Sequence, residues 1–105
     1  MANELLDYLE AATQRMVSTA KKKNNDYAGA EASDPFLNFT TVERLGIATT
    51  EQGLLTRMTD KFMRIINLTK QEAQVKDETI EDSLIDLSNY CLILAGYLSR
   101  KKRAV

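Results

Sequence analysis

Apolar residues recur at three- and four-residue spacing along three long stretches of the chain, and this spacing predicts three amphipathic helices. We expect them at about residues 3–22, 49–70 and 79–100. The second and third begin with the pattern of a capping box, in Thr49 with Gln52 and in Thr79 with Asp82. A fourth, short helix is expected to start near Thr40, with Glu43 as its capping partner. The predicted fold is therefore all-α, a small helical bundle of three main helices plus one short helix.

The last predicted helix carries more apolar surface than one face can hold. A continuous seam runs along it, and further apolar residues lie outside that seam. Because a helix that is apolar on most sides is normally enclosed on most sides, one short chain cannot bury it alone. We therefore expect oligomerisation to complete the bundle, as a homodimer or a larger homo-oligomer, with Cys91 buried as a small apolar side chain. The seam residues are Ile80, Leu84, Leu87, Cys91, Leu94 and Leu98, and the others are Ile85, Leu92, Ile93 and Tyr97.

Residues 24–39 read as the one long irregular stretch, because Asn, Asp, Gly and the single Pro35 are loop formers. The stretch also contains Tyr27, Phe36 and Phe39. Long loops in small domains are usually functional or disordered, and the aromatic residues favour an ordered loop. We expect it to be a ligand loop.

Composition narrows the classes of function. The chain has 105 residues, which suggests a single domain over residues 1–105. Its formal net charge of −1 argues against a general binder of DNA, RNA or membranes, which normally needs a basic excess. No apolar stretch approaches the roughly 20 residues that span a bilayer. One cysteine and no histidine exclude histidine-based nucleophilic catalysis and a structural zinc shell, and they favour a cytoplasmic location.

Two charged stripes are the candidates for chemistry. Arg57, Lys61 and Arg64 fall within roughly 60° of arc on the second long helix, and Asp82, Asp86 and Asn89 do so on the third. Each stripe is either a solvated face with weak ion pairs or part of a buried site. A nucleotide site requires cations for the phosphate and aromatic rings for the base, and this chain has both.

Five segments, taken in order, resemble a known family. They are KKKNNDYAG, DPFLNF, ERLG, LLTRMTDKFMRIINL and DETIEDSLIDLSNY. Together they resemble the phage and bacterial nucleotide modification associated domain, over about residues 21–97. The resemblance implies a helical protein of phage type that binds or acts on nucleotides, in the host cytoplasm if a phage encodes it.

The helix layout is also distantly similar to the all-α NTP pyrophosphohydrolases of the MazG and dimeric dUTPase kind. Those enzymes hold Mg²⁺ with a Glu-x-x-Glu pair on one helix and a Glu-x-x-Asp pair on the next. This chain departs from that pattern. Asp86 matches the final Asp, but Ser83 stands three residues before it, and the other helix carries Asp60 among its cations.

Three hypotheses follow, and the sequence leaves all three open. The first is a protein that holds a phosphate-bearing nucleotide, cyclic or signalling ligands included, without a cofactor and without hydrolysis, sequestering a signal of host defence. The second is a divergent Mg²⁺-dependent nucleotide pyrophosphohydrolase, with Asp60, Asp82 and Asp86 as metal ligands and Glu81 as a further one. The third is a structural or partner-binding helical bundle. The expected ligand-binding residues are Lys23, Asp26, Tyr27, Phe39, Arg57, Asp60, Lys61, Arg64, Asp82, Asp86 and Asn89.

Overall fold

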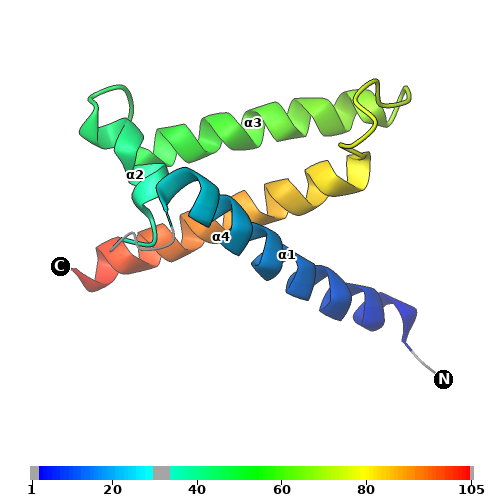
Figure 1. Ribbon diagram of the computed structural model, residues 1–105, viewed down its shortest axis with the longest axis horizontal. Helices are drawn as coiled ribbons and strands as arrows, with labels where there is room; N and C mark the ends of the chain where they lie inside the picture. Colours follow the sequence, from blue (N-terminus) through cyan, green and yellow to red (C-terminus); the bar gives the residue numbers. More distant parts are fainter. Residues whose placement is uncertain (1–2, 30–33, 105) are drawn as a thin grey trace. The chain divides into compact units, whose positions relative to one another are not determined.

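The computed structural model describes residues 3–29 and 34–104, and every regular element within them is an α-helix (Figure 1). The helices are α1 (Glu4–Ala28), α2 (Leu37–Arg44), α3 (Thr50–Leu68) and α4 (Ile80–Arg103). The all-α prediction is confirmed. The chain divides into two compact units, a first unit of Met1–Asn38 and a second unit of Phe39–Val105.

Helix α1 is longer than the sequence pattern predicted. It begins after Asn3, whose side chain accepts the Leu6 N–H at 3.1 Å, and it continues to Ala28. Extending an existing helix costs less than nucleating one, and Asn or Asp costs less than 1 kcal/mol relative to Ala inside it. The helix stops at Gly29, where φ is +89°. The prediction of an irregular stretch from residue 24 is therefore wrong for its first five residues, and residues 30–33 lie outside the described part.

Helix α2 begins three residues before its predicted start. The Asp34 carboxylate accepts the Phe36 N–H at 2.9 Å, and the Asp34 carbonyl accepts the Leu37 N–H at 3.1 Å. This turn starts the helix at Leu37, so Thr40 lies inside it and its predicted capping box with Glu43 is wrong. The Glu43 carboxylate instead accepts the backbone N–H of Thr50 at 2.8 Å, which ties α2 to the start of α3.

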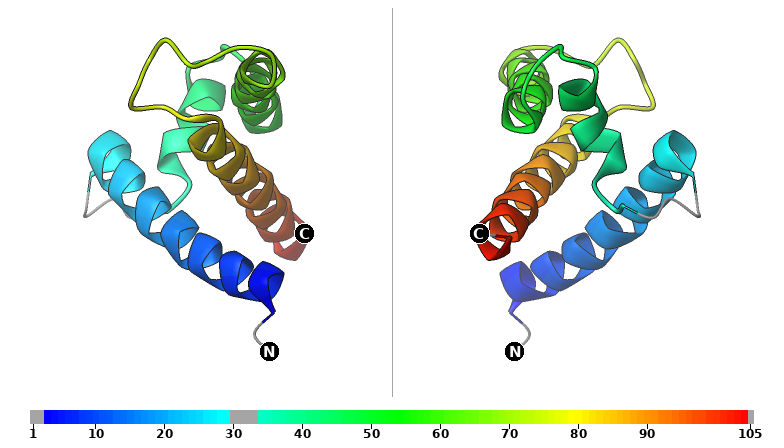
Figure 2. Two further views of the ribbon diagram at one scale, coloured as in Figure 1. Left: turned by 90° about the vertical axis from the view of Figure 1, so that its right-hand side faces the viewer. Right: turned by 90° about the vertical axis from the view of Figure 1, so that its left-hand side faces the viewer.

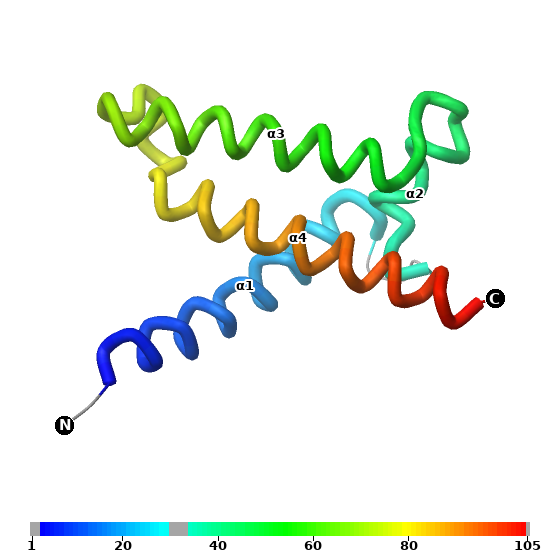
Figure 3. Tube along the Cα trace, turned by 180° about the vertical axis from the view of Figure 1, so that it is seen from behind, coloured from blue at the N-terminus to red at the C-terminus, as the bar shows by residue number. Residues whose placement is uncertain are grey.

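Helices α3 and α4 lie side by side and run in opposite directions, with α2 at the start of α3 (Figures 2 and 3). The capping boxes predicted for these two helices are confirmed. The Thr49 hydroxyl accepts the Gln52 N–H at 3.0 Å, and the Thr79 hydroxyl accepts the Asp82 N–H at 3.1 Å. At the end of the pair where α3 begins and α4 ends, Lys101 donates to Glu51 at 2.8 Å.

The face that α4 turns towards α3 is not the apolar seam that the sequence suggested. Ser83 is 1% exposed, whereas Leu84 and Leu98 are nearly half exposed and Cys91 is exposed. The prediction that Cys91 is buried is therefore wrong for the single chain. Because α4 is apolar on most sides, its periodicity alone does not decide which side meets α3.

None of the helices over residues 3–29 and 34–104 is long and apolar enough to cross a membrane.

Candidate functional site

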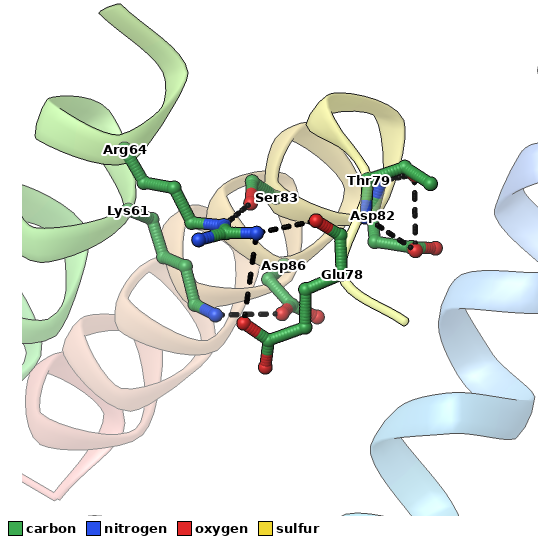
Figure 4. A network of polar contacts seen from close by, with 7 residues as sticks. All are labelled: Lys61, Arg64, Glu78, Thr79, Asp82, Ser83 and Asp86. Atoms are coloured by element: carbon green, nitrogen blue, oxygen red, sulfur yellow. Dashed lines mark hydrogen bonds and ion pairs between the residues drawn. The ribbon is translucent and has the colours of Figure 1, made fainter. Parts of the chain in front are cut away.

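A polar network joins the middle of α3 to the first half of α4 (Figure 4). The Lys61 ammonium lies 3.0 Å from the Asp86 carboxylate, and these side chains are 23% and 16% exposed. Arg64 donates through Nε to the Ser83 hydroxyl at 3.1 Å and through Nη2 to the Glu78 carbonyl. Its Nη2 also lies 3.8 Å from the Glu78 carboxylate. Two cations of α3 are thus held by α4 and by the last part of the connection before it.

The spacing of these residues explains why they pair. Lys61 and Arg64 are three residues apart on α3, and Ser83 and Asp86 are three apart on α4, so each pair occupies one helix face. Burial by itself would lower the pKa of Lys61, but the hydrogen bond to Asp86 and the charge of that carboxylate outweigh it and raise the pKa. The lysine therefore stays charged, and the pair ties α3 to α4.

The three carboxylates predicted as metal ligands, Asp60, Asp82 and Asp86, do not converge on one place. Asp86 faces Lys61, whereas the Asp82 carboxylate accepts the N–H and the hydroxyl of Thr79 at the start of α4, apart from Lys61 (Figure 4). Asp60 is exposed on α3. Across the part of the chain that the structure describes, no three Asp, Glu or Cys side chains form a group that could hold a metal ion.

The third cation of the stripe, Arg57, has a different neighbour. Its guanidinium lies over the ring of Phe39, 5.0 Å from the ring centre. Both side chains line one pocket of about 290 Å³, between α2, the connection that follows it and the first half of α3. Most of the pocket wall is apolar. The other lining residues are Val42, Ile47, Ala48, Gly53, Leu54 and Thr56.

Close packing of α2 on α3 shapes this pocket. A Cβ atom on Gly53 would lie 2.9 Å from Cγ1 of Val42, which is closer than such atoms approach, so the helices meet where α3 has no side chain. Leu54 is 1% exposed, and the hydrogen bond from Thr50 to Glu43 holds the same junction. The pocket wall is thus fixed by contacts close to the start of α3.

The remaining predicted ligand residues lie elsewhere. Lys23, Asp26 and Tyr27 are exposed on the last turns of α1, in the first unit, and Tyr27 is 71% exposed. Asn89 lies on α4, one turn after Asp86, and is partly exposed. The structure therefore joins Phe39 with Arg57, and Lys61 with Asp86, within the second unit.

Sequence reasoning missed several residues of these two places. Ser83 and Glu78 of the network, and Val42 and Gly53 of the pocket, were not among the predicted ligand residues. The sequence did contain a signal for Ser83. Ser83 and Asp86 are three residues apart on α4, which matches the spacing of Lys61 and Arg64 on α3, so the two pairs can face each other. The pocket residues carry no charged or aromatic signal, and they become apparent only when α2 meets α3.

A family model matches most of the chain. The model of the family called nucleotide modification associated domain 1 matches residues 23–95, which is more than half of the chain. The chain belongs to this family. The matched part includes the whole of α2 and α3, and with them the pocket and the α3–α4 network. No curated protein and no solved structure matches the chain. The distant similarity to pyrophosphohydrolases stays a prediction.

Proposed function

We propose that this protein binds a small phosphate-bearing nucleotide in the pocket between α2 and α3 and holds it without cleaving it. The observation that carries the proposal is the meeting of Phe39 and Arg57 on one pocket of about 290 Å³. A volume near 300 Å³ is at the lower end of the range for small-molecule sites. Both residues were expected to contact a nucleotide, on independent chemical grounds.

The two side chains supply the two kinds of contact that a nucleotide needs. An aromatic ring offers a face on which a base stacks, and a guanidinium offers planar N–H donors that match phosphate oxygens. The guanidinium carbon of Arg57 lies over the ring of Phe39, and the N–H donors of a guanidinium lie in its own plane. Stacking and phosphate binding are therefore compatible at this arginine. The apolar wall, which includes Val42 and Ile47, suits the rest of a base.

The other two cations of the stripe support the structure of the α3–α4 pair in this proposal. A phosphate that approached Lys61 would compete with Asp86, and one that approached Arg64 would compete with Ser83 and Glu78. Drawing one partner away from a partly buried ion pair leaves the other charge uncompensated, which is costly. We therefore assign Asp86 to holding Lys61, and phosphate binding to Arg57 because its side chain lines the pocket.

The carboxylates also favour binding over hydrolysis. Metal-assisted hydrolysis needs several carboxylates that converge on one ion. Here Asp86 is engaged by Lys61 and Asp82 by Thr79, at separate places on α4. The proposal therefore needs no cofactor. We expect the nucleotide to dissociate from the protein without having been cleaved.

The first experiment is an equilibrium binding panel. Mono-, di- and triphosphates and cyclic mono- and dinucleotides are each incubated with the protein and Mg²⁺, and bound ligand is released by denaturation and identified by chromatography. We expect at least one nucleotide to be recovered intact, and a short DNA or RNA oligomer not to displace it, because the net charge is −1. A cleaved product would favour the pyrophosphohydrolase hypothesis, and no binding across the panel would overturn the proposal.

Two substitutions and one control then locate the site. Arg57→Gln removes charged hydrogen bonds worth about 1.5–3 kcal/mol, which corresponds to a loss of affinity of about tenfold or more. Phe39→Leu keeps apolar bulk but removes the aromatic face, worth about 1–3 kcal/mol per stacked base. Arg44→Gln removes the same charge from an exposed position of α2 outside the pocket, and we expect it to leave affinity unchanged. Equal losses in Arg57→Gln and Arg44→Gln would contradict the assignment.

A further inference from the structure

An apolar groove runs along one side of the α3–α4 pair and plays no part in the proposed nucleotide pocket. Its volume is about 370 Å³. The Thr59 hydroxyl at its edge is already bonded to the Leu55 carbonyl at 2.8 Å. Its walls are otherwise apolar side chains, namely Leu55, Met58, Phe62 and Met63 on α3 with Leu87 and Cys91 on α4.

The groove lies where the apolar faces of both helices meet solvent. Phe62 is 52% exposed and Met63 53% exposed, and Leu84 and Leu98 extend the apolar seam of α4 to either side at nearly half exposure. Two helices that touch along one face cannot enclose a second apolar face. A contiguous exposed apolar surface of this kind marks an interaction site.

The lack of charge in the groove favours a second copy of this chain as its occupant. In a twofold contact the same surface of both copies meets, so a groove that carried one sign of charge would bring like charges together. None of the side chains that line this groove carries a formal charge at pH 7, and the net charge of the whole chain is only −1. Repulsion between copies is therefore weak. Methionine side chains adapt their shape, so Met58 and Met63 can pack against the same residues of another copy.

We propose that this groove is a self-association surface, on which the α3–α4 pair of a second copy packs to form a four-helix contact. Such an arrangement buries the apolar sides of both helix pairs in a common core. It also covers Leu87 and Cys91, which belong to the apolar seam of α4 that led us to expect an oligomer. The proposal does not depend on nucleotide binding.

Sedimentation equilibrium over a range of protein concentrations tests the proposal. We expect a dimer or larger species for the wild type. Met63→Glu places a charge in the groove, and we expect the monomer mass. Leu92→Glu is the matched control, because Leu92 is 63% exposed on α4 but lies outside the groove, and we expect the wild-type mass. A wild type that is monomeric throughout, or a Met63→Glu variant of wild-type mass, would overturn the proposal.

The single cysteine gives a second test that needs no substitution. Cys91 is exposed and lines the groove, and the chain has no other thiol. We expect the rate constant for its alkylation to fall as protein concentration rises, because a second copy covers the groove. In Met63→Glu the rate constant should not depend on protein concentration. A concentration-independent rate in the wild type would contradict self-association through this surface.

Discussion

Three cations that lie along one side of α3 have different neighbours, and these neighbours decide what each can do. Lys61 faces Asp86, and Arg64 contacts α4 and the residues just before it, so both join two helices. Arg57 lies one turn before Lys61, and its guanidinium lies over the ring of Phe39. The same residue type in one stripe is thus structural at one position and suited to a ligand at another.

Gly53 illustrates how one position sets the shape of the pocket. An alanine in mid-helix normally adds up to about 1 kcal/mol of stability over glycine. Here the added Cβ would meet Cγ1 of Val42 at 2.9 Å, and Val42 is β-branched and stiff. Overpacking typically costs about 1–3 kcal/mol. We therefore expect Gly53→Ala to lower the free energy of unfolding by about 1 kcal/mol, as measured by urea denaturation.

The matched control for Gly53→Ala removes the side-chain atoms of Val42 that the new Cβ would overlap. Val42→Ala takes away the methyl groups, so the double variant should regain the helix-propensity benefit of alanine at position 53. We expect Gly53→Ala to stabilise the protein in the Val42→Ala background and to destabilise it in the wild-type background. Destabilisation of equal size in both backgrounds would show that the contact with Val42 is not the cause.

At the scale of helices, local signals in the sequence were reliable and choices between faces were not. The capping boxes at Thr49 and Thr79 involve residues three apart, so their chemistry is complete within a few residues of sequence. Thr40 carried the same signal, yet an earlier turn at Asp34 started that helix first. The end of α1 was misplaced because Asn and Asp are tolerated inside a helix that has already formed.

The candidate site was only partly predictable for the same reason. Phe39 and Arg57 were both expected to bind a ligand, but their contact depends on how α2 packs against α3. Lys61 and Asp86 were assigned to two separate stripes, and periodicity could not reveal that the stripes face each other. Because α4 is apolar on most sides, the seam that includes Cys91 looked like its buried face.

The Lys61–Asp86 pair should make a measurable contribution to joining α3 and α4. Removing a donor from a partly buried charged acceptor costs about 1–3 kcal/mol, so we expect Lys61→Met to lower the free energy of unfolding by that amount at pH 7. The pKa of Lys61 is raised in the folded state. Its stabilisation is therefore complete below the unfolded pKa of about 10.4 and is lost as pH rises through the folded pKa.

Denaturation of both proteins from pH 7 into the alkaline range checks this linkage. The difference in unfolding free energy between wild type and Lys61→Met should stay constant up to about pH 10 and shrink above that. The double variant Lys61→Met with Asp86→Leu serves as a control, because replacing both partners of a pair by apolar groups is often nearly neutral. A difference that grows with pH would contradict the raised pKa.

At the scale of the whole molecule, the two proposed surfaces share α3 but occupy opposite sides of it. The pocket uses Gly53, Leu54, Thr56 and Arg57, and the groove uses residues from Leu55 to Met63. At about 100° per residue, the centres of these two sets are roughly 180° apart around the helix axis. A nucleotide and a second copy of the chain can therefore approach α3 at the same time.

This placement predicts that nucleotide binding and self-association are independent. Coupling between two sites is reciprocal, so a lack of coupling must appear in both directions. We expect Met63→Glu to become monomeric and to bind nucleotide with the wild-type Kd, and Arg57→Gln to lose affinity while it keeps the wild-type mass. Titration calorimetry and sedimentation equilibrium on the same samples measure both quantities. A tenfold loss of nucleotide affinity in Met63→Glu, with unchanged helical content by circular dichroism, would contradict this independence. The ligand site would then require the second copy of the chain, and the two sites on α3 would be coupled.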